Sequence, residues 1–376
     1  MRPRSRTLAL AALLGSAGLG ATLVRSRETA SPTLSPERRE AGIAFFEARW
    51  AADGRDYLAG RQLVQRYVAR FGVEADLADL GRAESAATHL VAVAPDPARS
   101  WSRVSAVQLM QHKFAPALAA AEAAVRADSG DAEAWGALVD AALAAGRYAQ
   151  AQGALRRLPP REVGTLTRWA AYHAARGAPR RAIPFQDRAC RALARANASG
   201  LARAWCLTEL AGMEGMVHGP EAERARLREA LVALPGYRGA LESMAGVAAA
   251  REDWREAHRL YLAVATDAHP DLYLRLGEVS RRLGLAEQAA AWESRFEAAA
   301  LAPGREPLYG PEIARWLLGK GRAEEALAVA RREVERRPTI ESWQLLATVL
   351  CARGQHADAL RALDQAAGWL HRPGQG

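Results

Sequence analysis

From Pro36 onward, alanine and leucine recur at intervals of three to four residues, as they do along the buried face of an α-helix. No stretch alternates apolar and polar residues in the manner of a half-buried strand. Glycines such as Gly146 and Gly354 interrupt the pattern at short intervals, and Pro235 and Pro338 lie where a helix must stop. The pattern predicts an all-α protein made of short amphipathic helices.

The helical pattern is also periodic. A glycine or other residue suited to a turn is followed two residues later by an aromatic or small residue, and three residues further on by an alanine. We call these alanines the marker positions: Ala83, Ala117, Ala151, Ala182, Ala257, Ala289, Ala326 and Ala359. Neighbouring markers are 31–37 residues apart, except for one 75-residue interval in which Glu223 takes the place of the alanine. The spacing predicts nine units.

Three units share an arrangement of apolar residues before the marker. Trp135 is followed by Leu138, Tyr273 by Leu276 and Gly277, and Trp343 by Leu346. In this arrangement the chain resembles the tetratricopeptide repeat (TPR), a helix–turn–helix of about 34 residues. The resemblance implies a right-handed superhelical solenoid of about nine TPR-like helix-turn-helix repeats.

The resemblance also divides the chain. We expect the TPR-like array to cover residues 58–368, with an irregular stretch at 182–235 and an additional loop at 302–307. Residues 37–57 are predicted to form a capping helix that covers the first repeat, and residues 369–376 a tail.

The first 24 residues predict export. A basic start is followed by the apolar run Leu8–Leu14 and then by small residues, as in a secretory signal peptide. An uncleaved N-terminal membrane anchor is the alternative, because residues 7–24 approach the length of a membrane span. Residues 25–36 read as a linker. Either interpretation places the repeats outside the cytoplasm: periplasmic, extracellular, or anchored in the cytoplasmic membrane.

The charge of the chain changes this picture little. The formal net charge is +9 and the sequence pI is about 10.0, values that raise the question of nucleic-acid binding. Five arginines and no acid lie in residues 1–27, so the remainder carries only +4. No aromatic platform accompanies the basic pairs of the repeats, and we expect no nucleic-acid partner.

The sequence offers no recognisable catalytic or metal-binding motif. It contains no P-loop, no zinc-protease helix and no nucleophile elbow, and its eight histidines never lie three or four residues apart. We therefore expect no enzyme, no metal and no cofactor. Cys190 and Cys206 could meet across two antiparallel helices, either as a disulfide or as small buried thiols, and the thiols are the favoured interpretation.

Curved repeat arrays bind partners on the concave surface lined by their first helices. Transferred to this sequence, the surface positions of the repeat predict a partner-binding groove. Its candidate residues are Arg99, Arg103, Asp140, Arg275, Glu278, Arg282 and Arg315, beside the polar Ser102, Glu133, Glu312, Gln344 and Thr348. Arginine side chains suit an acidic or carboxyl-terminal peptide, because the guanidinium can hold a carboxylate through two hydrogen bonds.

The sequence thus predicts an exported, non-catalytic scaffold that binds a protein or peptide of unknown identity. Two alternatives stay open. The protein could be an assembly or accessory factor of an envelope complex, or an enzyme whose unrecognised site lies in the irregular middle repeats.

Overall fold

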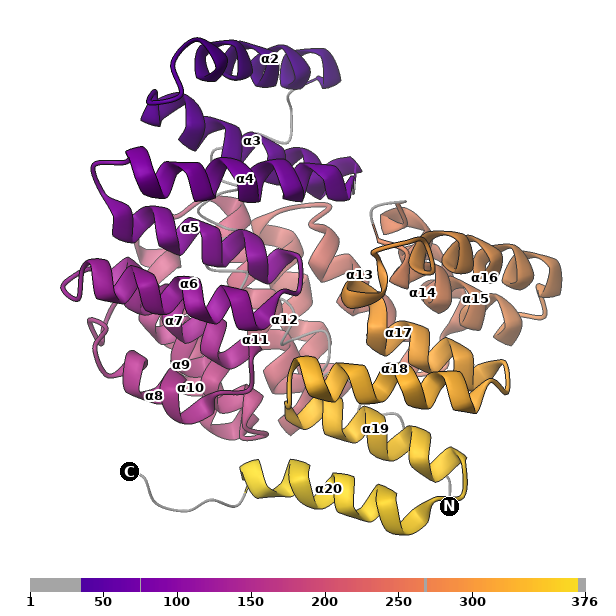
Figure 1. Ribbon diagram of the computed structural model, residues 1–376. Coiled ribbons are helices and arrows are strands. Elements are labelled where there is room, and N and C mark those ends of the chain that lie inside the picture. The colour runs from indigo at the N-terminus through magenta and orange to yellow at the C-terminus, as the bar shows by residue number, and fades with distance from the viewer. Residues whose placement is uncertain (1–34, 75, 267–268, 371–376) are drawn as a thin grey trace. The chain divides into compact units, whose positions relative to one another are not determined.

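The computed structural model describes residues 35–74, 76–266 and 269–370. These residues form 19 α-helices and no strand, as the all-α prediction requires (Figure 1). The predicted export segment, most of the predicted linker and residues 371–376 of the predicted tail lie outside the described residues.

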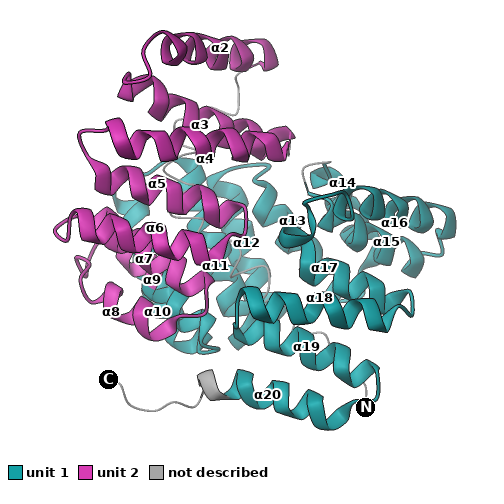
Figure 2. Cartoon of the chain, viewed as in Figure 1, with its two compact units in different colours: residues 1–17, 169–376 teal, residues 18–168 magenta. Residues whose placement is uncertain are grey.

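The chain divides into two compact units (Figure 2). Among the described residues, unit 2 covers 35–168 and unit 1 covers 169–370. The repeat pattern does not predict this division, because it continues through residue 168 without interruption.

Unit 2 begins with a single helix and continues with antiparallel helix pairs. Its helices are α2 (Pro36–Ala52), α3 (Tyr57–Glu74), α4 (Leu77–Val93), α5 (Pro97–Met110), α6 (Phe114–Ala127), α7 (Ala132–Ala144), α8 (Tyr148–Leu155) and the start of α9 (Val163–Ala175).

Unit 1 continues the same arrangement. Its helices are the remainder of α9, then α10 (Pro179–Arg195), α11 (Gly200–His218), α12 (Pro220–Ala233), α13 (Arg238–Ala250), α14 (Trp254–Val264), α15 (Asp271–Arg282), α16 (Ala286–Ala300), α17 (Glu306–Gly319), α18 (Ala323–Arg336), α19 (Ile340–Ala352) and α20 (His356–Leu370). We call the odd-numbered helices from α3 to α19 first helices and their even-numbered partners second helices.

The nine pairs coincide with the nine predicted repeats. Every marker alanine lies in a second helix, and none is more than 6% exposed. A short side chain there lets the two helices of a pair approach closely, as in α15 and α16, where Gly277 faces the backbone of Ala289. The turn before each second helix often needs a left-handed residue, which is Gly146 or Gly354 in two units and Glu252, with φ of 62°, in another.

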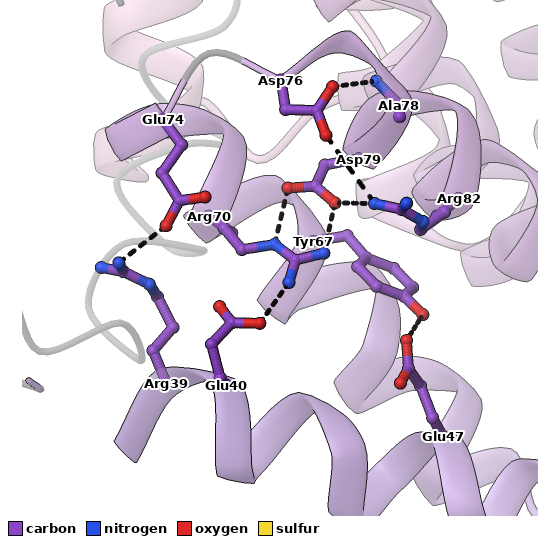
Figure 3. A network of polar contacts seen from close by, with 10 residues as sticks. All are labelled: Arg39, Glu40, Glu47, Tyr67, Arg70, Glu74, Asp76, Ala78, Asp79 and Arg82. Carbon is purple, nitrogen blue, oxygen red and sulfur yellow. Dashed lines mark hydrogen bonds and ion pairs between the residues drawn. The ribbon is translucent and has the colours of Figure 1, made fainter. Parts of the chain in front are cut away.

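The single helix α2 is fastened to the first repeat by an ion-pair network (Figure 3). The fully buried Asp79 of α4 accepts two hydrogen bonds from Arg70 of α3, at 2.6 and 2.7 Å, and one from Arg82. Arg70 also donates to Glu40 of α2. Because Asp79 is buried, loss of Arg70 would leave its charge in the core with Arg82 as the one remaining partner of this network.

The predicted irregular stretch is regular in its pairing but has longer helices. Helices α10 and α11 contain 17 and 19 residues. The predicted additional loop at 302–307 is present over residues 301–305, and α17 begins at Glu306. The backbone of α17 leaves helical geometry at Tyr309, two residues before Pro311.

Cys190 and Cys206 form a disulfide between α10 and α11, with their Cα atoms 5.5 Å apart. The interpretation as two buried thiols is therefore wrong. The antiparallel packing of these two helices sets the Cα separation within the range that a disulfide needs, and the sequence spacing alone could not show this.

Removing the disulfide should lower stability substantially. The disulfide joins residues 16 positions apart. Its removal restores freedom to the unfolded chain and is expected to lower the free energy of unfolding by about 3 kcal/mol. We expect Cys190→Ser with Cys206→Ser to melt several degrees lower, as measured by circular dichroism without reductant. Cys351→Ser, which changes an exposed free thiol, is the control and should melt like the parent protein. Equal melting of all three proteins would contradict the cross-link.

Candidate functional site

Within each unit, some successive first helices contact one another directly. Helix α5 contacts α7 in unit 2, and in unit 1 α11 contacts α13, α15 contacts α17 and α17 contacts α19. No pair of successive second helices packs comparably among the described residues. The first helices are therefore the inner side of each stack, where the sequence placed the groove.

In unit 2, the predicted groove residues are joined to one another by ion pairs. Arg99 of α5 is exposed and lies 3.1 Å from Asp96 and 3.8 Å from Glu133 of α7. Arg103 is half-buried one turn further along α5. The contact between Arg99 and Glu133 joins α5 to α7.

Asp140 differs from the expectation of a groove side chain. It is 3% exposed, and both of its oxygens accept hydrogen bonds from Arg168 of α9, at 2.8 and 2.9 Å. The sequence does not distinguish this buried ion pair from an exposed groove position, because Arg168 lies 28 residues from Asp140. Asp140 connects two first helices instead of facing a partner.

In unit 1, charged side chains gather on three adjacent first helices. Asp271 and Arg275 come from α15, Glu312 and Arg315 from α17, and Glu242 from α13, and all are half-buried. Arg315 forms an ion pair with Glu312 at 3.1 Å. Arg275 interacts electrostatically with Asp271, Glu312 and Glu242. We call these five residues the groove cluster.

The protonation equilibria of the cluster reflect its burial. Loss of solvation raises the pKa of Asp271 to about 6, and nearby Glu242 adds to the shift. Burial likewise raises the pKa of Glu312, although Arg315 partly opposes it. Burial disfavours the charge on Arg275, but the surrounding negative groups hold its pKa above the ordinary value. Burial is therefore the main cause of both raised carboxyl pKa values, and the nearby arginines offset it only in part.

Glu278 and Arg282 do not join the cluster. Both are exposed, and the Arg282 guanidinium lies over the Trp254 ring of α14, 5.4 Å from its centroid. The sequence expectation of arginines in excess over acids does not hold for this segment, because Asp271, Glu242 and Glu312 surround the two arginines that remain.

The sequence analysis did not predict Asp271 and Glu242 as groove residues, although both lie on first helices. Asp271 could have been predicted from its place on a first helix beside an apolar core residue, Leu272. On α19, Gln344 is half-buried and Thr348 is exposed, and the Thr348 hydroxyl donates a hydrogen bond to the Gln344 carbonyl.

The described residues contain no group of three or more histidine, cysteine or acidic side chains arranged to hold a metal ion. Among the same residues, no helix is long and apolar enough to cross a membrane.

A family model matches part of the repeat array. Residues 108–177 match the sequence model of the tetratricopeptide repeat family. No curated protein matches the chain by sequence search.

Solved structures share the fold. Human IFIT1, solved as a dimer with PPP-AAAA, is 14% identical and has a TM-score of 0.50; the match covers 83% of this chain and 73% of IFIT1. A tetratricopeptide repeat protein from Parabacteroides merdae is 16% identical, with a TM-score of 0.45 and coverage of 66% and 98%. PilW, a type IV pilus biogenesis factor, is 15% identical, with a TM-score of 0.44 and coverage of 57% and 99%. At these identities the likeness concerns the fold alone.

Proposed function

We propose that this tetratricopeptide repeat protein is an exported, non-catalytic scaffold that binds a segment of another protein on the first-helix face of unit 1. The observation that carries the proposal is the groove cluster. Five ionisable side chains are half-buried on adjacent first helices, and two of the carboxyl groups have raised pKa values. Such clusters of perturbed groups are more frequent at functional sites than elsewhere.

The cluster also indicates the chemistry of the partner. Carboxylates with raised pKa values gain stability when a cation approaches, whereas Arg275 and Arg315 can receive a carboxylate. A segment that presents a basic and an acidic side chain close together would complement both. This replaces the acidic or carboxyl-terminal peptide that the sequence favoured.

Export is supported by two independent features. The sequence of residues 1–24 has the basic, apolar and small regions of a signal peptide or anchor. The Cys190–Cys206 disulfide suits an oxidising compartment, since such bonds are rare in the cytosol. Intact-mass measurement on protein from the native host tests this proposal, which a soluble cytoplasmic species beginning at Met1 would overturn.

A charge-neutral double variant tests the groove. Glu312→Gln with Arg315→Gln removes the ion pair while keeping the size of the carboxyl side chain and the net charge of the protein. Quantitative capture of partners from an envelope extract, followed by mass spectrometry, should recover the principal partner at least fivefold less efficiently with this variant. Circular dichroism should show an unchanged helix content.

The matched control is Glu293→Gln with Arg281→Gln, which removes another 3.1 Å ion pair of unit 1, from α15 and α16. It should capture the partner as the parent protein does. If both double variants capture it equally well, the groove cluster is a structural feature and the proposal fails.

A further inference from the structure

A pocket opens between two second helices of unit 1. Helices α12, α13 and α14 enclose a volume of about 290 Å³. Its floor is apolar and includes Leu241, Met244 and Ala248 of α13, while Arg228 of α12 and Arg259 of α14 line its opposite walls. The pocket therefore combines an apolar floor with a cation on each side.

A second pocket has the same construction. Helices α18, α19 and α20 enclose about 270 Å³, with Trp343, Leu346 and Leu350 of α19 as the floor. Arg331 of α18 and Arg361 of α20 line its walls.

The two pockets use equivalent positions of the repeat. Each floor residue of the first pocket has its counterpart 102 residues further along the chain, as Met244 has Leu346 and Ala248 has Leu350. Arg259 and Arg361 are also 102 residues apart, and each lies two residues after its marker alanine. The pockets are thus the same site, repeated after three repeats.

The ion pairs of the two sites match as well. Arg259 pairs with Glu256 at 2.7 Å, and Arg361 pairs with Asp358, in both cases three residues earlier on the same helix. On the other wall, Arg228 and Arg331 are exposed and have no hydrogen bond or ion pair to any described residue. Of these equivalent arginines, each site therefore has one that is compensated and one that is available to a ligand. The first pocket is also lined by Arg224 and by Arg251, which pairs with Glu221.

The repeat fold itself does not require these arginines. At the two intervening junctions of second helices, the positions of Arg228 and Arg259 are occupied by Leu262 and Ala291, and then by Ser294 and Ala328. The arginine pair is present at the first and the last of these four junctions and absent from the two between them.

We propose that the two pockets form a repeated docking surface for an acidic segment of a partner protein. One large apolar side chain of the segment enters each pocket, and a neighbouring carboxylate binds the free arginine, Arg228 or Arg331, in two hydrogen bonds. Each volume lies just below the usual range of sites for small molecules and suits a single side chain. Because both sites lie in one unit, a partner with two such segments would bind them together with increased avidity.

This surface lies between second helices, whereas the groove cluster lies on first helices. The two proposals can therefore fail separately, and the variants that test one leave the other unchanged.

The test uses a fluorescein-labelled synthetic peptide in which a leucine and a phenylalanine lie between glutamates. Isothermal titration and fluorescence anisotropy should show two peptides bound per chain. Arg228→Glu with Arg259→Glu should leave one, and so should Arg331→Glu with Arg361→Glu. The protein carrying all four substitutions should bind more than tenfold more weakly, with an unchanged circular dichroism spectrum.

The control variant is Arg188→Glu with Arg195→Glu, which makes the same change of charge on the exposed face of α10. It should still bind two peptides. A second peptide with serines in place of the leucine and phenylalanine should bind at least tenfold more weakly.

The proposal would be overturned by no binding of the acidic peptide, by equal weakening in the control variant, or by equal binding of the serine peptide, which would indicate diffuse charge attraction. Arginine-dependent binding to phosphatidylglycerol vesicles without binding to the peptide would also overturn it, since the surface would then recognise a membrane.

Discussion

Placing a glutamate at a marker position should destabilise the protein strongly. Ala151 of α8 is fully buried and Ala289 of α16 is 2% exposed. Ala→Glu at either position overpacks the contact between the helices of a pair, at about 1–3 kcal/mol, and buries a carboxylate without a partner, which costs more. For a unit of this size each kcal/mol lowers the melting temperature by about 2–4 °C. We expect both variants to melt at least about 6 °C lower than the parent protein.

The matched control is Ala298→Glu, because Ala298 lies on the same helix as Ala289 but is exposed. It should melt within about 1 °C of the parent protein, as surface substitutions usually do. Hydrogen exchange adds a spatial readout. Stability in stacked repeats depends mainly on neighbouring repeats, so Ala151→Glu should loosen α7 and α8, and Ala289→Glu α15 and α16. Equal melting of all three variants would show that the assigned repeat register is wrong.

The repeat register could be predicted because it depends on local spacing. A marker alanine, the apolar residues before it and the turn between them all lie within one unit of about 34 residues. The structure confirms this at all eight marker alanines, including Ala182, which precedes the longest interval between markers. Even Glu223 falls where the period places it, on the second helix α12.

The charged sites could not be predicted to the same degree, because their neighbours come from different repeats. Asp140 has the spacing of a groove residue, yet Arg168 of the next first helix neutralises it. Asp271 acquires its raised pKa from burial and from Glu242, which belongs to another helix. The Cys190–Cys206 bond likewise depends on how two helices are aligned and not on the 16 positions between them.

Glu223 should make the stability of unit 1 depend on pH. It replaces the marker alanine, and its carboxyl group reaches Gly215 of α11, where an added Cβ would lie 2.3 Å from a Glu223 oxygen. The absence of a side chain at Gly215 is what gives the longer residue room. Burial raises the pKa of Glu223 to about 7, from an ordinary value of 4.5.

The sign of the pH effect follows from this shift. Below pH 4.5 the carboxyl is protonated in both the folded and the unfolded chain, and it carries no penalty. Between pH 4.5 and 7 the unfolded chain releases its proton while the folded chain keeps it, so folding becomes less favourable by about 1.4 kcal/mol for each pH unit. Above pH 7 the accumulated penalty levels off at about 3 kcal/mol.

Glu223→Gln should therefore be more stable than the parent protein above pH 7, by about 3 kcal/mol, and equally stable at pH 4. Urea unfolding at half-unit steps from pH 4 to pH 8 measures the difference directly. Glu229→Gln, an exposed position on the same helix, should show no comparable gain, because that side chain remains solvated when the protein folds. If the difference between Glu223→Gln and the parent protein stays constant across this range, the Glu223 carboxyl is hydrated in the folded state, and the second helix α12 is packed less closely against Gly215 than the structure describes.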